Sequence, residues 1–259
     1  MKRARLRSRV VPQASLSTSQ RQRMLQLMQD CYDGVDVERF FVDLAAKDFV
    51  IVLEDPRGAL MGFSTLLLRD ERLDDGTPVD LVFSGDTVID PAHWGSKALQ
   101  TAFGKFCLQQ KLKHPHKKLY WLLLSKGFRT YLLAVNYFPR TFPKPHTAPP
   151  STLIAFRDRI ATSLWGDAYN PLTEVLHWPV PRDRVRAPLS PPPADALQNE
   201  AVRFFLHRNP GHVDGDELVC LVGLPLRDLL RALVRATAKA VEAGVRPRRR
   251  RAATITEAR

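Results

Sequence analysis

The stretch Asp86–Phe103, DTVIDPAHWGSKALQTAF, constrains the fold of this chain more than any other. Its β-branched start predicts a strand, Pro91 turns the chain, and the residues after it predict a helix over 93–112. Strand-to-helix junctions often bind phosphate, because the first N–H groups of a helix have no partner and its dipole favours an anion. A phosphate loop needs two or three glycines, whereas this junction has only Gly95. The stretch therefore raises the question of which phosphate, if any, it binds.

The basic charge of the chain is concentrated at its two ends. The net charge is +12 over 259 residues, and residues 1–10 and 246–259 contribute about +5 each. We expect both ends to be disordered, as a basic arm over 1–14 and a basic tail over 246–259. Such ends attract nucleic acid or anionic lipid without specificity. The body between them is nearly neutral, which argues against a dedicated nucleic-acid surface.

The cysteines and apolar runs indicate an intracellular globular protein. Cys31, Cys107 and Cys220 are too few and too scattered for a disulfide framework, and each lies in an apolar run typical of a buried thiol. The apolar runs are too short to span a bilayer, and the N-terminus has no apolar segment of a secretion signal. We therefore expect a cytoplasmic location. His114 and His116 have no acidic or cysteine cluster nearby, so no metal is expected.

The order of elements predicts a mixed α/β fold. Two helices precede a hairpin around EDPRG, and the next strand, VDLVFSGDTVID, contains Ser84-Gly85, which predicts a bulge. The apolar run KKLYWLLLS predicts a buried strand, and KGFRTYLLAVNYF predicts the helix after it. No G-x-G-x-x-G or G-x-x-x-x-G-K-[ST] sequence is present, which weakens readings as a nucleotide-binding fold. We expect a mixed, mostly antiparallel central sheet flanked by helices.

The same junction resembles the acyl-CoA motif of the GNAT superfamily of N-acyltransferases, in which V-x-P-x-x-R-G-x-G-x-G runs from the fourth strand into a helix. Val88, Pro91 and Gly95 match in order, but Trp94 replaces the arginine, and Lys97 and Leu99 replace two glycines. The strand LYWLLLS and the helix after it resemble the family's fifth strand and following helix. Two segments, SKGFRTY and NPGHVDGDELVCLV, are similar to divergent bacterial GNAT-like proteins. The resemblance implies an acyltransferase domain over 15–225 and a C-terminal helix over 226–245.

This resemblance implies a thioester donor held between two strands that part. The residues expected to bind the donor and its phosphate are Thr87, Val88, Ile89, Trp94, Gly95, Ser96, Lys97, Lys126 and Arg129. Lys126 and Arg129 are equally well read as surface charges of a helix. The candidates for proton transfer are Asp86 as a general base, His93 as a base or a helix cap, and Tyr131 or Tyr137 in place of the family's tyrosine general acid. Asp86, beside a glycine, is more often a turn residue.

The expected donor is acyl-CoA or a 4′-phosphopantetheine thioester. A single phosphate at Gly95, Ser96 and Lys97 suits the phosphodiester of an acidic acyl carrier protein better than the diphosphate of CoA, and the basic tails would help steer such a partner. The acceptor is expected to be a small molecule with an amine or hydroxyl. Two alternatives remain. The junction is an ordinary helix entry, or the chain is a non-catalytic binding module that uses its tails on nucleic acid or anionic membrane.

Overall fold

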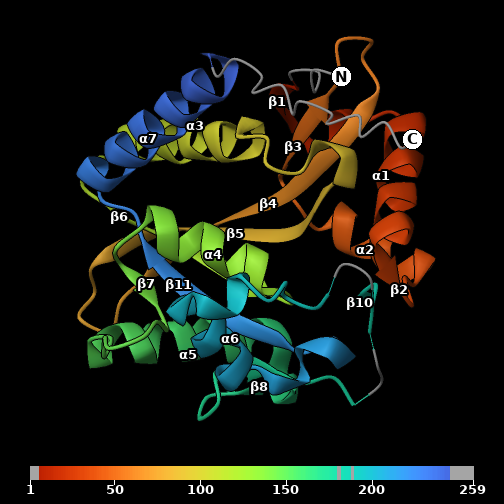
Figure 1. Cartoon of the computed structure of the whole chain (residues 1–259). Helices are drawn as coiled ribbons and strands as arrows, with labels where there is room; N and C mark the ends of the chain where they lie inside the picture. Colours follow the sequence, from red (N-terminus) through yellow and green to blue (C-terminus); the bar gives the residue numbers. More distant parts are fainter. Residues whose placement is uncertain (1–5, 180–181, 188–189, 246–259) are drawn as a thin grey trace, which may run out of the picture.

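The structure, a computed structural model, describes residues 6–179, 182–187 and 190–245 (Figure 1). The helices are α1 (Thr18–Cys31), α2 (Val37–Ala45), α3 (Ala98–Lys113), α4 (Phe128–Tyr137), α5 (Ser151–Trp165), α6 (Glu200–Arg208) and α7 (Leu226–Val245). The strands are β1 (Arg7–Pro12), β2 (Tyr32–Asp33), β3 (Phe49–Glu54), β4 (Leu60–Arg72), β5 (Pro78–Ile89), β6 (Lys118–Ser125), β7 (Thr141–Phe142), β8 (Tyr169–Asn170), β9 (Val175–Leu176), β10 (Arg184–Val185) and β11 (Glu217–Gly223).

The main sheet is mixed and mostly antiparallel, as the sequence predicts. Over the described residues its strand order is β1-β3-β4-β5-β6-β11-β9-β8, and β7 also pairs with β11. Within this order only β5 and β6 run parallel, because α3 carries the chain back between them. The predicted hairpin around EDPRG is confirmed as β3 and β4. Strands β2 and β10 form a separate small ribbon.

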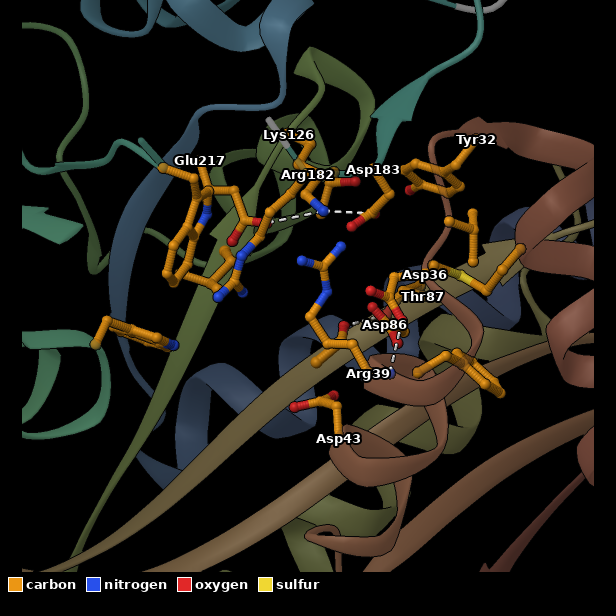
Figure 2. A pocket seen from close by; sticks show the side chains of 18 of the residues that line it. Tyr32, Asp36, Arg39, Asp43, Asp86, Thr87, Lys126, Arg182, Asp183 and Glu217 are labelled. Atoms are coloured by element: carbon orange, nitrogen blue, oxygen red, sulfur yellow. Dashed lines mark hydrogen bonds and ion pairs between the residues drawn. The ribbon is translucent and has the colours of Figure 1, made fainter. Parts of the chain in front are cut away.

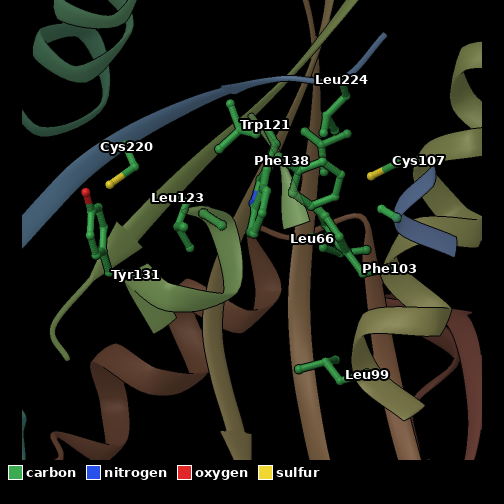
Figure 3. Close-up of a cluster of buried hydrophobic side chains, with 14 of the residues drawn as sticks. Leu66, Leu99, Phe103, Cys107, Trp121, Leu123, Tyr131, Phe138, Cys220 and Leu224 are labelled. Carbon is green, nitrogen blue, oxygen red and sulfur yellow. The ribbon is translucent and has the colours of Figure 1, made fainter. Parts of the chain in front are cut away.

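Helices cover both faces of the sheet. On one face, α1 and α2 pack over Val50, Val52 and Phe63, while α5 packs over the part near Leu81 and Leu122. On the other face, α3, α4, α6 and α7 share one apolar cluster with β5, β6 and β11. Figure 3 shows this cluster, in which Phe103 of α3 and Phe138 lie on either side of Trp121 from β6. The two layers hold the middle strands, β5 and β6, in fixed positions.

Strand β5 contains the predicted bulge. Thr87 pairs with Ser64, and Ser84 pairs with Leu66, so β5 uses one more residue than β4 between these two pairs. A Cβ on Gly85 would lie 2.6 Å from Thr65 Oγ1 and 2.9 Å from Lys47 Cε, so only glycine fits there. The extra residue shifts the alternation of side chains. Residues 79, 81 and 83 face the α5 side, and after the bulge Val88 faces α1.

Two predicted boundaries are wrong. The arm predicted over 1–14 is ordered from residue 6, because β1 pairs with β3, Leu6 is buried in the core, and Arg9 binds Glu54 at 2.6 Å. The helix predicted from residue 93 begins only at Ala98, because the chain first makes a short 3-10 turn over Pro91–His93 and then a turn at Gly95. The C-terminal helix predicted over 226–245 is confirmed as α7. Residues 1–5 and the predicted tail over 246–259 lie outside the described residues.

In the described part of the chain, no helix has the length and apolar character needed to cross a membrane. The same residues contain no group of three or more histidines, cysteines or acidic side chains placed to hold a metal ion.

Candidate active site

The site is organised around the place where β5 and β6 part. The two strands are paired from Val79 and Lys118 up to Ser84 and Leu123. Beyond that point β5 stays paired with β4 as far as Ile89, while β6 stays paired with β11 as far as Ser125. A slot therefore opens between the two strand ends, directly after the bulge. Thr87 of β5 and Thr130 of α4 face each other across it and line all three cavities described below.

The first cavity, which we call the donor cavity, lies between the β5–α3 junction and the start of α4. It has a volume of about 340 Å³. Seven of the predicted donor-binding residues line it: Thr87, Val88, Ile89, Trp94, Gly95, Ser96 and Arg129. The chain thus brings together residues from β5, the junction and α4 at one mouth of the slot. Of the remaining two, Lys97 and Lys126 lie elsewhere, as described below.

The junction is held rigid by Trp94. Its indole Nε1 donates a hydrogen bond to the carbonyl of Ile89 at 2.8 Å, which ties the turn back to the end of β5. The guanidinium of Arg129 stacks on the same indole, 4.9 Å from the ring centroid. Gly95 has a φ of 88°, a left-handed conformation that favours glycine. The N–H of Ala98 donates to Ser96 Oγ at 3.3 Å, and α3 begins there with its N-terminal dipole directed at the cavity.

Lys97 and His93 contribute little to this cavity. The Lys97 ammonium lies over the ring of Tyr137, 6.0 Å from its centroid, and Lys97 is not among the residues that line the three cavities. His93 accepts a hydrogen bond from the N–H of Ser96 through its backbone carbonyl and also lines none of the three. The structure thus gives His93 a role in shaping the turn.

The second, apolar cavity continues from the slot into the layer of α3, α4 and α7. Its walls include Leu99, Phe103, Trp121 and Phe138, and its volume is about 60 Å³. Trp121 Nε1 donates to Ser84 Oγ at 2.8 Å, which fixes the indole at the point where the strands part. Tyr137 lines this apolar cavity rather than the polar one.

Tyr131 does not reach any of these cavities. Its side chain is fully buried, its hydroxyl donates to the carbonyl of Pro143 at 3.0 Å, and its ring packs against Phe204 and Phe205. Burial also raises the pKa of this phenol far above its usual range. Tyr131 is therefore a core residue, and the prediction that it transfers a proton has no support in its position. Helix geometry explains this, because the adjacent residues Thr130 and Tyr131 point about 100° apart around α4 and so face different sides of the helix.

The third cavity, which we call the acceptor cavity, opens on the other side of the slot, beneath α1 and α2 (Figure 2). Its volume is about 170 Å³. Asp86 lies at its centre, and the bulge explains why. Without the extra residue, Asp86 would share the face of Val82 and Ser84, on the α3 side of the sheet. With it, Asp86 points toward α2.

Asp86 is a partly buried carboxyl group with a raised pKa. Burial raises its pKa to about 7, helped by the negative charge of Asp43. Lys126 and Lys47 act in the opposite direction but more weakly than the burial. The side chain is still partly open to the cavity. A carboxyl group with such a pKa, facing a cavity next to a slot, suits a general base.

Lys126 is engaged by two acidic side chains. Its ammonium lies 2.6 Å from Asp183 and 3.0 Å from Glu217 (Figure 2). Burial alone would lower the pKa of Lys126, but Glu217 and Asp183 together raise it, so the ammonium stays charged. Burial raises the pKa of Glu217. Lys126 thus links the end of β6 to the segment around Asp183 and to β11. It lies on the acceptor side of the slot, away from the junction where we expected it to bind phosphate.

Several lining residues of the acceptor cavity were missed in the sequence. Arg39 comes from α2, Arg182 and Trp178 from the segment before β10, Trp165 from the end of α5, and Glu217 from β11. They are far apart along the chain, and each stands in a stretch that reads as an ordinary surface or core segment. Only the folded sheet brings them to one place. The sole signal in the sequence was the bulge, which marks where the sheet opens.

The comparisons with known proteins give matches among solved structures, all at low identity. No family model matches the chain, and no curated protein matches it. Among solved structures, a probable N-acyltransferase from Enterococcus faecalis is 14% identical with a TM-score of 0.37, covering 52% of this chain and 32% of that protein. A GNAT family N-acetyltransferase, YhbS from Escherichia coli in complex with CoA, is 15% identical with a TM-score of 0.32, covering 48% of this chain and 64% of that one.

A third solved structure, ElaA from Escherichia coli, is 19% identical with a TM-score of 0.37, and 56% of this chain matches 93% of that protein. This chain spans about a third of the length of the Enterococcus protein, and roughly half of the chain itself takes part in each of these matches. Because these TM-scores are below 0.5, we base the function on the geometry of this chain.

Proposed function

We propose that this GNAT-like chain is an acyltransferase, which moves an acyl group from a thioester donor to an amine or hydroxyl by direct attack. One observation carries the proposal. The slot between β5 and β6 joins the donor cavity, at the start of α3, to the acceptor cavity that contains Asp86. A donor arm that passes through the slot would present its thioester next to a carboxylate able to take a proton.

The slot supplies the contacts that such an arm needs. After Ser84, the edge of β5 that faces β6 has no partner strand among the described residues, so its backbone groups are available to pantetheine amides and to the thioester carbonyl. The N–H of Gly95 and the remaining first-turn N–H groups of α3 would hold a phosphate, since the N–H of Ser96 already donates to the carbonyl of His93. Leu99 stands where a glycine would leave more room in the loop, so this site suits one phosphodiester better than a diphosphate. This favours 4′-phosphopantetheine on a carrier protein over CoA as the donor.

The chemistry needs no covalent bond to the protein. Asp86, ionised above its pKa of about 7, takes a proton from the acceptor nitrogen or oxygen as that atom attacks the thioester carbonyl. The new bond to the acyl carbon forms as the carbon–sulfur bond breaks. The leaving thiolate takes up a proton, so the net proton balance is zero.

The direct test is mass spectrometry after the full chain is incubated with acyl-CoA or an acyl carrier thioester and a panel of small amines and alcohols. We expect a product whose mass increases by the acyl group, and loss of the thioester only when the acceptor is present. Calorimetry with each free donor separates the two donor classes. Binding of neither donor, together with no acyl product, would overturn the proposal.

A further inference from the structure

The acceptor cavity contains two arginines that face it from opposite walls. Arg39 extends into it from α2, and Arg182 extends into it from the segment before β10 (Figure 2). Both side chains are half-buried. In the described chain, no carboxylate lies close enough to either guanidinium to form an ion pair, for which the limit is 4.0 Å. Five acidic side chains nevertheless line the same cavity.

The acidic side chains around the cavity are already occupied. Asp36 accepts a hydrogen bond from the N–H of Arg39 at 2.9 Å and caps α2. Asp43 pairs with Lys47 at 2.6 Å. Asp183 and Glu217 share Lys126. Of these five side chains in the described residues, only Asp86 has no cation within ion-pair distance and caps no helix, and its pKa of about 7 leaves it partly protonated.

Two nearby cations that no carboxylate pairs at ion-pair distance are unfavourable in a partly dry cavity. Burial lowers the pKa of the Arg182 guanidinium, and the positive charge of Arg39 lowers it further, while the more weakly coupled carboxylates around the cavity act in the opposite direction without reversing the shift. The planar face of Arg182 is stacked on Trp178, 3.1 Å from its ring centroid, which leaves the edge of the guanidinium for hydrogen bonds. A guanidinium edge matches a carboxylate best, through two parallel hydrogen bonds.

We propose that Arg39 and Arg182 bind the carboxylate of the acceptor, and that the acceptor is therefore an amino acid whose amine faces Asp86. This deepens the proposed function and rests on it. A zwitterion suits a cavity in which two unpaired cations lie across from one titrating carboxylate. A phosphate dianion suits it less, because the carboxylates of Asp36, Asp43, Asp183 and Glu217 line the same walls.

The first arm of the test compares acceptors of matched shape. Each amino acid is assayed beside its carboxamide and its decarboxylated amine, with a fixed donor and product measured by mass spectrometry. We expect transfer to the amino acid, with a kcat/KM about 10- to 100-fold above that of the amide, because a charge-assisted contact is lost. Equal rates for amide, amine and amino acid would overturn the inference while leaving the acyltransferase function standing.

The second arm uses Arg39→Gln and Arg182→Gln in the full chain, with Arg184→Gln as the matched control. Arg184 is exposed, lies two residues from Arg182 and lines none of the three cavities. We expect each cavity variant to raise the KM for the amino acid by about 10-fold or more and to leave the KM for the carboxamide unchanged. Arg39→Lys should restore part of the loss, and the control should match the parent chain.

The two arms keep the failure of this inference apart from failure of the proposed function. Donor affinity, measured by calorimetry without acceptor, should be the same in the parent chain and all four variants, and it reports that each variant is folded. Donor binding with no transfer to any amino acid, or unchanged KM values in both glutamine variants, contradicts the inference alone. Absence of donor binding in the parent chain contradicts the proposed function itself.

Discussion

At the scale of single residues, the properties of Asp86 follow from its neighbour. Gly85 is the only residue that fits against Thr65 and Lys47, and it allows the bulge that turns Asp86 toward the acceptor cavity. Burial there, with Asp43 close by, raises the pKa of Asp86 to about 7. One glycine thus determines both the direction and the protonation state of the proposed base.

We expect Asp86→Asn to lower kcat/KM by about 10²- to 10⁴-fold, because the amide cannot accept the acceptor's proton. In the parent chain, kcat/KM should fall as the pH drops below about 7, where Asp86 becomes protonated. A pH–rate profile of both chains checks this, with Asp90→Asn at the same strand end as the control. A parent profile that is flat between pH 5 and 8 contradicts the role of Asp86.

The same pKa has a consequence for stability. Because folding raises the pKa of Asp86 from its ordinary value of 3.8 to about 7, its contribution to stability is fully present below pH 3.8 and is lost as the pH rises through about 7. Compared with the parent, Asp86→Asn should therefore gain relative stability between pH 5 and 8. Urea unfolding at the two pH values measures the difference, and a gain in the opposite direction would disprove the assignment.

Lys126 offers a prediction about the fold rather than the chemistry. Lys126→Met leaves Asp183 and Glu217 without their shared cation, so we expect a loss of about 3 kcal/mol in the free energy of unfolding at neutral pH. The loss should shrink in acid, where Glu217, whose pKa is raised by burial, becomes protonated. If Lys126→Met instead lowered the donor affinity without any loss of stability, the result would support the phosphate-binding role that the sequence suggested for Lys126.

At the scale of elements, the slot depends on β5 and β6 leaving each other after Ser84 and Leu123. Thr130 of α4 lines all three cavities that meet at the slot. We expect Thr130→Trp to fill it and to weaken donor binding about tenfold or more, at an overpacking cost of up to about 3 kcal/mol. Asn136→Trp, on the exposed face of the same helix, is the control. Calorimetry should show weakened binding in the first variant only, and equal donor affinities would show that the donor does not use the slot.

The elements also show how far the sequence leads. The hairpin, the bulge at Ser84-Gly85 and the buried strand β6 were predictable, because each depends on local turn residues or on an apolar run. The start of α3 was placed too early, since nothing in the sequence reveals that Gly95 adopts a positive φ. The strand β1 was missed because its two arginines made the segment resemble a disordered basic arm, although Val10 and Val11 favour a strand.

The site was predictable only in part, and the reason is physical. Six of the seven predicted residues that line the donor cavity lie between Thr87 and Ser96, so the junction motif was enough to predict them. The acceptor cavity is built from α2, α5, β11 and the segment before β10, and tertiary packing alone brings Arg39 and Arg182 together. Tyr131 was misplaced because a sequence position on α4 does not show which side of the helix meets the core.

At the scale of the whole molecule, the near-neutral body and the basic ends are expected to act separately. Deleting residues 246–259 should leave donor affinity unchanged, because the slot and its cavities are built from residues 28–233. It should weaken any binding to RNA or anionic vesicles, and the parent's binding to these should fall with added salt. Loss of donor binding together with the tail would favour the alternative, a binding module that works through its basic ends.

The central claim is that a thioester arm occupies the slot between β5 and β6. A crystal structure of the chain with a non-hydrolysable acyl-CoA or acyl-phosphopantetheine analogue tests it most directly. We expect the arm to lie between Thr87 and Thr130, its phosphate at Gly95 and Ser96, and its sulfur within reach of Asp86. An analogue bound elsewhere, or a slot that stays empty at saturating concentration while β5 and β6 close against each other, would contradict it.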